Sequence, residues 1–72
     1  MAADLHEYWQ HRTTGEVFAV KLRNESVIGV VQIDPRDVNV ELLPHLPYRS
    51  DDAKPIEHRR DEYCRIDGRM AA

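Results

Sequence analysis

The stretch from Tyr8 to Ile33 constrains the fold of this 72-residue chain more than any other. It holds three runs of β-favouring residues, YWQHR, EVFAVKLR and VIGVVQI, separated by the short sequences TTG and NES. Gly, Asn and Ser favour turns, and Gly and Asn tolerate the left-handed backbone that tight turns need. The pattern predicts three antiparallel strands, at residues 8–12, 16–23 and 27–33.

The first of these runs has a second interpretation. Leu5, Tyr8 and Trp9 also have the i, i+3, i+4 spacing of one helix face. We favour a strand, because the run is rich in aromatic residues and leads directly into the turn at Gly15.

The second and third strands carry apolar side chains on both faces. In VIGVVQI only Gln32 is polar, and Gly29 indicates a bulge or a point where another segment comes close. A strand that is apolar on both faces must be covered on both. The sheet therefore either curls into a small barrel or packs its second face against the C-terminal segment or another subunit.

The sequence after the third strand predicts a turn and then another extended segment. Asp34 and Pro35 favour a turn that ends the strand. Apolar and polar residues then alternate, which predicts a fourth strand at residues 38–43. Pro44 and Pro47 prevent that strand from continuing.

The prolines leave three large apolar side chains, Leu43, Leu46 and Tyr48, on an irregular segment. One interpretation is a loop packed over one end of the core. The other is an exposed apolar edge that docks onto a partner, because exposed apolar patches often mark interfaces.

The C-terminal third is more polar. Residues 49–54 have the composition of a linker. Residues 55–67 form either a short helix, with Asp52 as its N-cap and Gly68 beyond its end, or a closing strand near Tyr63. We favour the helix, and we expect residues 68–72 to be disordered.

Together these elements predict a mainly β fold, or a small α+β fold, built on an antiparallel meander of three or four strands. The single domain spans residues 1–67 and has its core in residues 5–48. A short meander with a bend and a returning strand resembles SH3-like small barrels. The resemblance rests on the strand pattern of residues 8–43 alone and implies no function, since this architecture has many functions.

Length and composition indicate how such a chain is stabilised. A chain this short buries a low fraction of its surface, so disulfides, a metal or oligomerisation often support it. Cys64 is the only cysteine, which excludes an intramolecular disulfide and suits a reducing compartment. The sequence has no apolar leader and no run long enough to span a membrane. We therefore expect a cytoplasmic protein without a membrane segment.

The residues with catalytic or ligand chemistry form no recognisable motif. His6 and His11 are five apart, a spacing that places them on different faces of either a helix or a strand. Cys64 has no catalytic sequence signature around it. Asp34 is the residue expected at the start of the turn, and Asp37 is a plausible partner for Arg36. The three glycines are too scattered for a phosphate-binding loop. We therefore expect no enzymatic activity, no metal site and no cofactor.

The leading hypothesis is a small non-enzymatic binding or accessory protein that acts as a homo-oligomer or with a protein partner. The excess of apolar strand faces over the small core supports it. The candidate partner-binding residues lie on the third strand and on the segment after it, and they are Val27, Val31, Ile33, Leu43, Leu46 and Tyr48.

The alternative is single-stranded nucleic-acid binding, in which bases stack on aromatic side chains beside basic ones. Its candidate residues are Tyr8, Trp9, Arg12, Lys21 and Arg23. The net charge is −3 and acidic residues stand among the basic ones, so we expect the aromatic side chains to belong to the core and nucleic acid not to be the partner.

Overall fold

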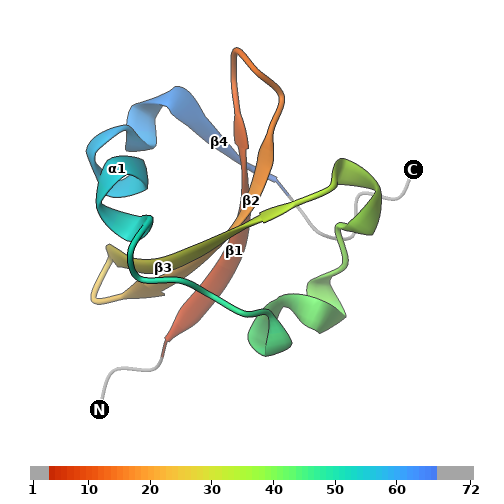
Figure 1. The fold of residues 1–72 in the computed structure, drawn as a ribbon, viewed down its shortest axis with the longest axis horizontal. Coiled ribbons are helices and arrows are strands. Elements are labelled where there is room, and N and C mark those ends of the chain that lie inside the picture. The colour runs from red at the N-terminus through yellow and green to blue at the C-terminus, as the bar shows by residue number, and fades with distance from the viewer. Residues whose placement is uncertain (1–3, 67–72) are drawn as a thin grey trace.

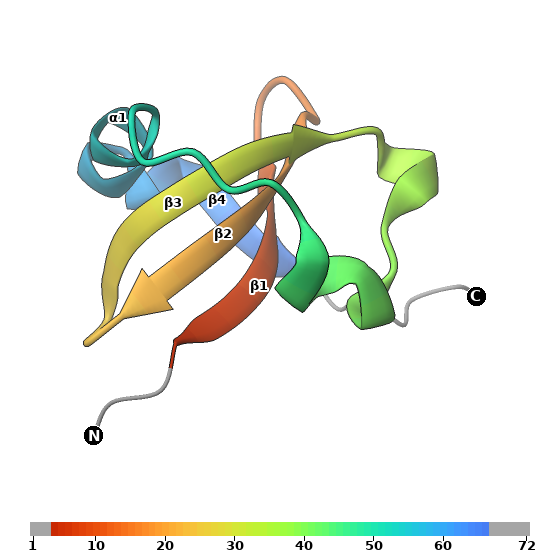
Figure 2. The same cartoon turned by 60° about the horizontal axis from the view of Figure 1, so that its bottom comes forward.

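The computed structural model describes residues 4–66 and contains one open, four-stranded antiparallel sheet (Figures 1 and 2). In the sheet order β3-β2-β1-β4, the strands are β3 (Ser26–Ile33), β2 (Val17–Arg23), β1 (Leu5–His11) and β4 (Tyr63–Ile66). The helical elements are the 3-10 turns η1 (Pro35–Asp37), η2 (Val40–His45) and η3 (Arg60–Glu62), and the helix α1 (Ala53–His58). The prediction of a mainly β, small α+β fold is confirmed.

The three predicted strands are present, including the strand interpretation of the first run. The turn between β1 and β2 has Gly15 at φ 80°, and the turn between β2 and β3 has Asn24 at φ 52° and Glu25 at φ 66°. This two-residue turn lets Arg23 pair with Ser26 at once. Two consecutive left-handed residues are typical of the turns that join twisted antiparallel strands.

The SH3-like barrel is not confirmed, because β3 is an edge of the sheet and not the neighbour of a closing strand. Arg49 pairs with Val30 there, through one hydrogen bond in each direction, of 3.0 Å and 2.9 Å. Further along the same edge, the N–H of Val27 donates to Oε1 of Glu57 at 2.6 Å. The C-terminal segment therefore occupies this edge, and β4 pairs with β1 on the other side of the sheet.

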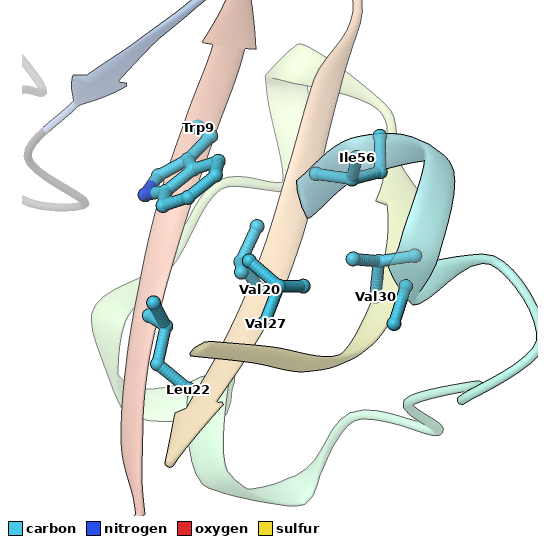
Figure 3. Packing of buried hydrophobic residues seen from close by; sticks show 7 residues of the cluster. Trp9, Val20, Leu22, Val27, Val30 and Ile56 are labelled. Carbon is cyan, nitrogen blue, oxygen red and sulfur yellow. The ribbon is translucent and has the colours of Figure 1, made fainter. Parts of the chain in front are cut away.

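Both faces of the sheet are covered within one chain, by α1 on one face and by residues 34–48, the covering segment, on the other (Figures 1 and 2). The buried residues on the α1 face are Trp9, Val20, Leu22, Val27, Val30, Ala53 and Ile56 (Figure 3). Those on the other face are Tyr8, Val17, Ala19 and Leu43. The core therefore extends beyond residues 5–48 into α1.

Polar contacts fix α1 over the sheet. Glu57 accepts the Val27 amide through Oε1 and binds Nη1 of Arg60 through Oε2 at 3.0 Å. The same Nη1 donates to the carbonyl oxygen of Glu25 at 2.7 Å. Partial burial alone would raise the pKa of Glu57, but the Val27 amide and the Arg60 guanidinium outweigh it and lower the pKa. The carboxylate therefore stays charged where it joins α1 to β3.

The prediction of a strand at residues 38–43 is wrong, because the chain forms the 3-10 turn η2 there. Oδ1 of Asn39 accepts the N–H of Glu41 at 2.9 Å, which is an N-cap contact. The buried Tyr8 hydroxyl donates to the Asn39 carbonyl oxygen at 2.8 Å and accepts the Asn39 N–H at 3.1 Å. With its backbone groups bonded in this way, the segment cannot add a strand to the sheet.

The C-terminal element contains both a helix and a strand. The helix α1 ends at His58, earlier than predicted, and the chain enters the sheet again at Tyr63. A longer helix would place Arg59 and Arg60 on the same face as its apolar residues, whereas the turn η3 leaves both exposed. The predicted disordered tail, 68–72, lies outside the described residues.

Gly29 is the point of close approach that the sequence predicts, beside a bulge in β3. A Cβ atom added there would lie 3.1 Å from the Cβ of Tyr48. The main-chain pairing of Arg49 with Val30 prevents Tyr48 from moving away freely.

We therefore expect Gly29→Ala to lower the free energy of unfolding by about 1–3 kcal/mol, the usual cost of overpacking. Urea denaturation followed by Trp9 fluorescence measures it. Ser26→Ala, on the exposed start of the same strand, is the control and should change the free energy by less than about 0.5 kcal/mol. Equal stability of the glycine and alanine proteins would contradict the tight contact.

Candidate functional site

Both ring nitrogens of the His11 side chain contact neighbouring groups. Its Nε2 lies 2.9 Å from Oε1 of Glu62, and its Nδ1 accepts the backbone N–H groups of Thr13 and Thr14 at 3.1 Å and 3.2 Å. The Tyr63 ring meets the imidazole edge to face at 4.9 Å. Both ring nitrogens are occupied, so His11 fastens the β1–β2 turn and has no free nitrogen for acid–base chemistry.

The other residues whose side chains could act in catalysis or bind a metal do not form a common site in the described part of the chain. Cys64 is exposed on the edge strand β4. Asp34 accepts the backbone N–H of Arg36 at 2.9 Å, and this bond, together with the Arg36 guanidinium, lowers the pKa of the Asp34 carboxyl. Within residues 4–66, no group of three or more His, Cys, Asp or Glu side chains is placed to hold a metal ion.

The residues proposed for nucleic-acid binding do not share a surface. Tyr8 and Trp9 are 1% and 7% exposed and face opposite sides of the sheet. Arg12 lies in the β1–β2 turn, while Lys21 and Arg23 contact Asp4 at 3.6 Å and 2.8 Å. A stacking platform needs exposed aromatic faces beside cations that are free to bind phosphate. These residues do not combine the two on one surface.

The residues proposed for partner binding are brought together with one exception. Val27 is buried on the α1 face. The other five share the cluster between the sheet and the covering segment, where Leu43 is buried and the rest are partly buried: Val31, Ile33, Leu43, Leu46 and Tyr48. Most of this apolar surface therefore packs within the chain, and only its border is open to another molecule.

That border is a hollow of about 520 Å³, here called the loop hollow. Its apolar lining comes from Ile33, Val38, Leu42 and Leu46, and its polar lining from Gln32, Asp34, Arg36, Asp37 and Asn39. Leu42 is 46% exposed and its neighbour Val40 is 41% exposed. Among residues 4–66, only Leu5 is a further large hydrophobic side chain with comparable exposure. Of these three exposed side chains, Leu42 lines the loop hollow and Val40 is close to it in sequence.

The rim of the loop hollow carries charges of both signs. Arg36 is 90% exposed, and its Nε lies 3.4 Å from Oδ1 of Asp34. Asp37 is exposed, and the structure of residues 4–66 gives it no ion pair. The hollow therefore combines apolar walls with a cation and a carboxylate that are open to a second molecule.

Sequence reasoning missed Val40 and Leu42 as exposed residues, whereas Val38 is partly buried against the core. The alternation of apolar and polar residues at positions 38–43 predicted a fourth strand or an extended segment. Asn39 followed by Glu41, together with Pro44, is the signal that favours a capped turn.

None of the helices in the described part of the chain is long and apolar enough to cross a membrane. Comparison with protein-family models, curated proteins and solved structures found no match for this chain. Its function must therefore be inferred from its own geometry.

Tyr48 fixes the covering segment from within. Its hydroxyl donates to the carbonyl oxygen of Leu43, and its ring lies 5.3 Å from that of His6. Burial, and secondarily the neighbouring Tyr8, raises the pKa of Tyr48 to about 12 from an ordinary value of 10. The unfolded chain therefore ionises first as the pH rises, and the folded state loses stability.

We expect the contribution of Tyr48 to be complete below pH 10 and to be lost as the pH rises to about 12. Urea denaturation across this range measures it. Tyr48→Phe should be less stable at neutral pH, because the Leu43 carbonyl oxygen loses its donor, but its stability should fall less steeply above pH 10. Parallel pH profiles for the two proteins would contradict the assignment.

Proposed function

We propose that this chain is a small non-enzymatic interaction module that acts by self-association, with the loop hollow and Leu42 as its contact surface. The observation that carries the proposal is that a half-exposed apolar side chain lines an apolar hollow in the same surface. Each copy would thus offer both a projecting group and a space to receive one.

A two-fold dimer uses the same patch on both copies and therefore needs a patch that complements itself. In the proposed dimer, Leu42 of each copy enters the hollow that Ile33 and Leu46 line in the other. Arg36 of each copy then faces Asp37 of the other, so opposite charges meet at the rim. Pairing of this kind favours the two-fold arrangement over other orientations.

The available surface supports a weak rather than an obligate dimer. A standard interface buries about 800 Å² on each partner, so the contact must extend from the hollow onto Val40 and the rim. Fully burying a valine or leucine side chain contributes about 1.5–3 kcal/mol, and Val40 and Leu42 are already more than half buried. Ordering and association costs oppose this gain, so we expect a dissociation constant on the order of 10–100 µM.

Two further observations support the non-enzymatic part of the proposal. His11 uses Nδ1 in the β1–β2 turn and Nε2 in its contact with Glu62, and Asp34 acts as a turn cap with a lowered pKa. A single cysteine suits a protein of the reducing cytoplasm, which we propose as its location.

Sedimentation equilibrium tests the interface. We expect the wild-type chain to dimerise in the micromolar range and Leu42→Lys to bind itself at least about 10-fold more weakly, because a lysine ammonium would enter an apolar space. Leu5→Lys is the matched control, since Leu5 is 59% exposed and does not line the hollow. A wild-type chain that remains monomeric at about 1 mM, or equal weakening by both substitutions, would overturn the proposal.

A charge exchange tests the orientation. Arg36→Asp should weaken the dimer, and Arg36→Asp combined with Asp37→Arg should restore it, because the two charges then meet again with their signs reversed. Failure of the double variant to recover would contradict the proposed two-fold pairing, whereas loss of association in Leu42→Lys would still identify the surface.

A further inference from the structure

A second cavity, the helix pocket, lies on the α1 face of the sheet and has a volume of about 290 Å³. Its lining residues come from β2, β3, α1 and the segment before α1, and they are Phe18, Val30, Val31, Gln32, Arg49, Asp52, Pro55 and Ile56. Only Gln32 also lines the loop hollow. The two cavities can therefore be tested separately.

The interior of the helix pocket is apolar and rigid. Val30 and Ile56 belong to the buried core, one on β3 and the other on α1. Phe18 packs against that core and meets Tyr63 edge to face, with ring centroids 5.8 Å apart. Walls supplied by strands and a helix keep their positions better than loop residues do. The pocket is thus preformed to receive a large apolar group.

Two residues of opposite charge, Arg49 and Asp52, line the pocket. The main chain of Arg49 is fixed by its two hydrogen bonds to Val30, whereas its side chain is 68% exposed and contacts Asp51 only at 3.9 Å. Asp52 occupies the N-cap position of α1, but its side chain makes no cap hydrogen bond. Within residues 4–66, the Asp52 carboxylate has no ion pair or hydrogen bond either. A guanidinium and a carboxylate are therefore both open to a ligand.

The volume indicates the size of that ligand. Pockets for drug-sized molecules measure about 300–1,000 Å³, so the helix pocket is slightly smaller than this range and suits a ligand smaller than a nucleotide. A small molecule that carries a large apolar side chain, one anionic group and one cationic group is a zwitterionic amino acid.

We infer that the helix pocket binds a free α-amino acid with a large aliphatic or aromatic side chain. The side chain packs on the accessible parts of Phe18 and Pro55, next to the buried Val30 and Ile56. The ligand's carboxylate binds the Arg49 guanidinium, and its ammonium binds the Asp52 carboxylate. This site gives the chain a small-molecule ligand in addition to the proposed self-association, and it does not depend on that proposal.

Titration of the isotope-labelled full chain with L-leucine, followed by amide chemical shifts, tests the site. We expect saturable shifts at Phe18, Val30, Gln32 and Arg49 with a dissociation constant on the order of 1 mM, as suits so small a ligand. L-Alanine lacks the apolar portion, N-acetyl-L-leucine lacks the cation and L-leucinamide lacks the anion. Each should bind at least about 10-fold more weakly.

Two substitutions assign the charges. Arg49→Gln and Asp52→Asn should each weaken L-leucine binding about 10-fold, while Arg65→Gln, which is exposed on β4 and lines neither cavity, should leave it unchanged. The Arg49 variant keeps the main-chain pairing with Val30, and circular dichroism verifies that each variant is folded.

Three results would overturn the inference. The first is the absence of saturable shifts with L-leucine at about 10 mM. The second is equal binding of L-leucine and L-leucinamide, which would mean that the pocket accepts any apolar side chain, including one from a protein. The third is unchanged L-leucine binding by both folded charge variants.

Discussion

The structure depends on one constraint, which is that strands β2 and β3 are apolar on both faces and need two covers from one short chain. The covering segment supplies one cover, through Leu43. The helix α1 supplies the other, through Ala53 and Ile56. The chain passes from one face to the other around the edge of β3, and the pairing of Arg49 with Val30 fixes that crossing. The hydrophobic effect thus determines the course of the chain after β3.

The elements that depend on neighbouring residues were predictable from the sequence. The three strands follow from local alternation and β-propensity, and the turns at Gly15 and Asn24 follow from the few residues that adopt left-handed geometry. The close contact at Gly29 was also predictable from the local sequence, since a glycine inside an apolar strand indicates that another segment leaves no room for a side chain. The need for cover on both faces was also evident, and the C-terminal segment was one of the covers considered, although the sequence did not decide between it, a closed barrel and another subunit.

The rest depends on contacts between distant residues, which a local pattern does not contain. The Tyr8 hydroxyl fixes Asn39 across 31 positions and turns a strand-like alternation into η2. β4 pairs with β1 because the chain returns to the opposite edge of the sheet. Five of the candidate partner-binding residues lie in one region of the molecule. The sequence left open whether the loop at residues 43–48 packs over the core or docks onto a partner, and in the structure it packs over the core. The half-exposed Leu42 emerged only once the fold was known.

The closed edge of β3 has a consequence for aggregation. The sequence VIGVV combines high β-propensity with no charge and no proline, which is typical of segments that template cross-β assembly. In the folded chain, Arg49 and Glu57 bond the outward amides of Val30 and Val27, so this edge is not available to another chain. β4, at the other edge, is short and carries Arg65. Local opening of residues 49–58, without global unfolding, is therefore the event that would expose the most aggregation-prone strand.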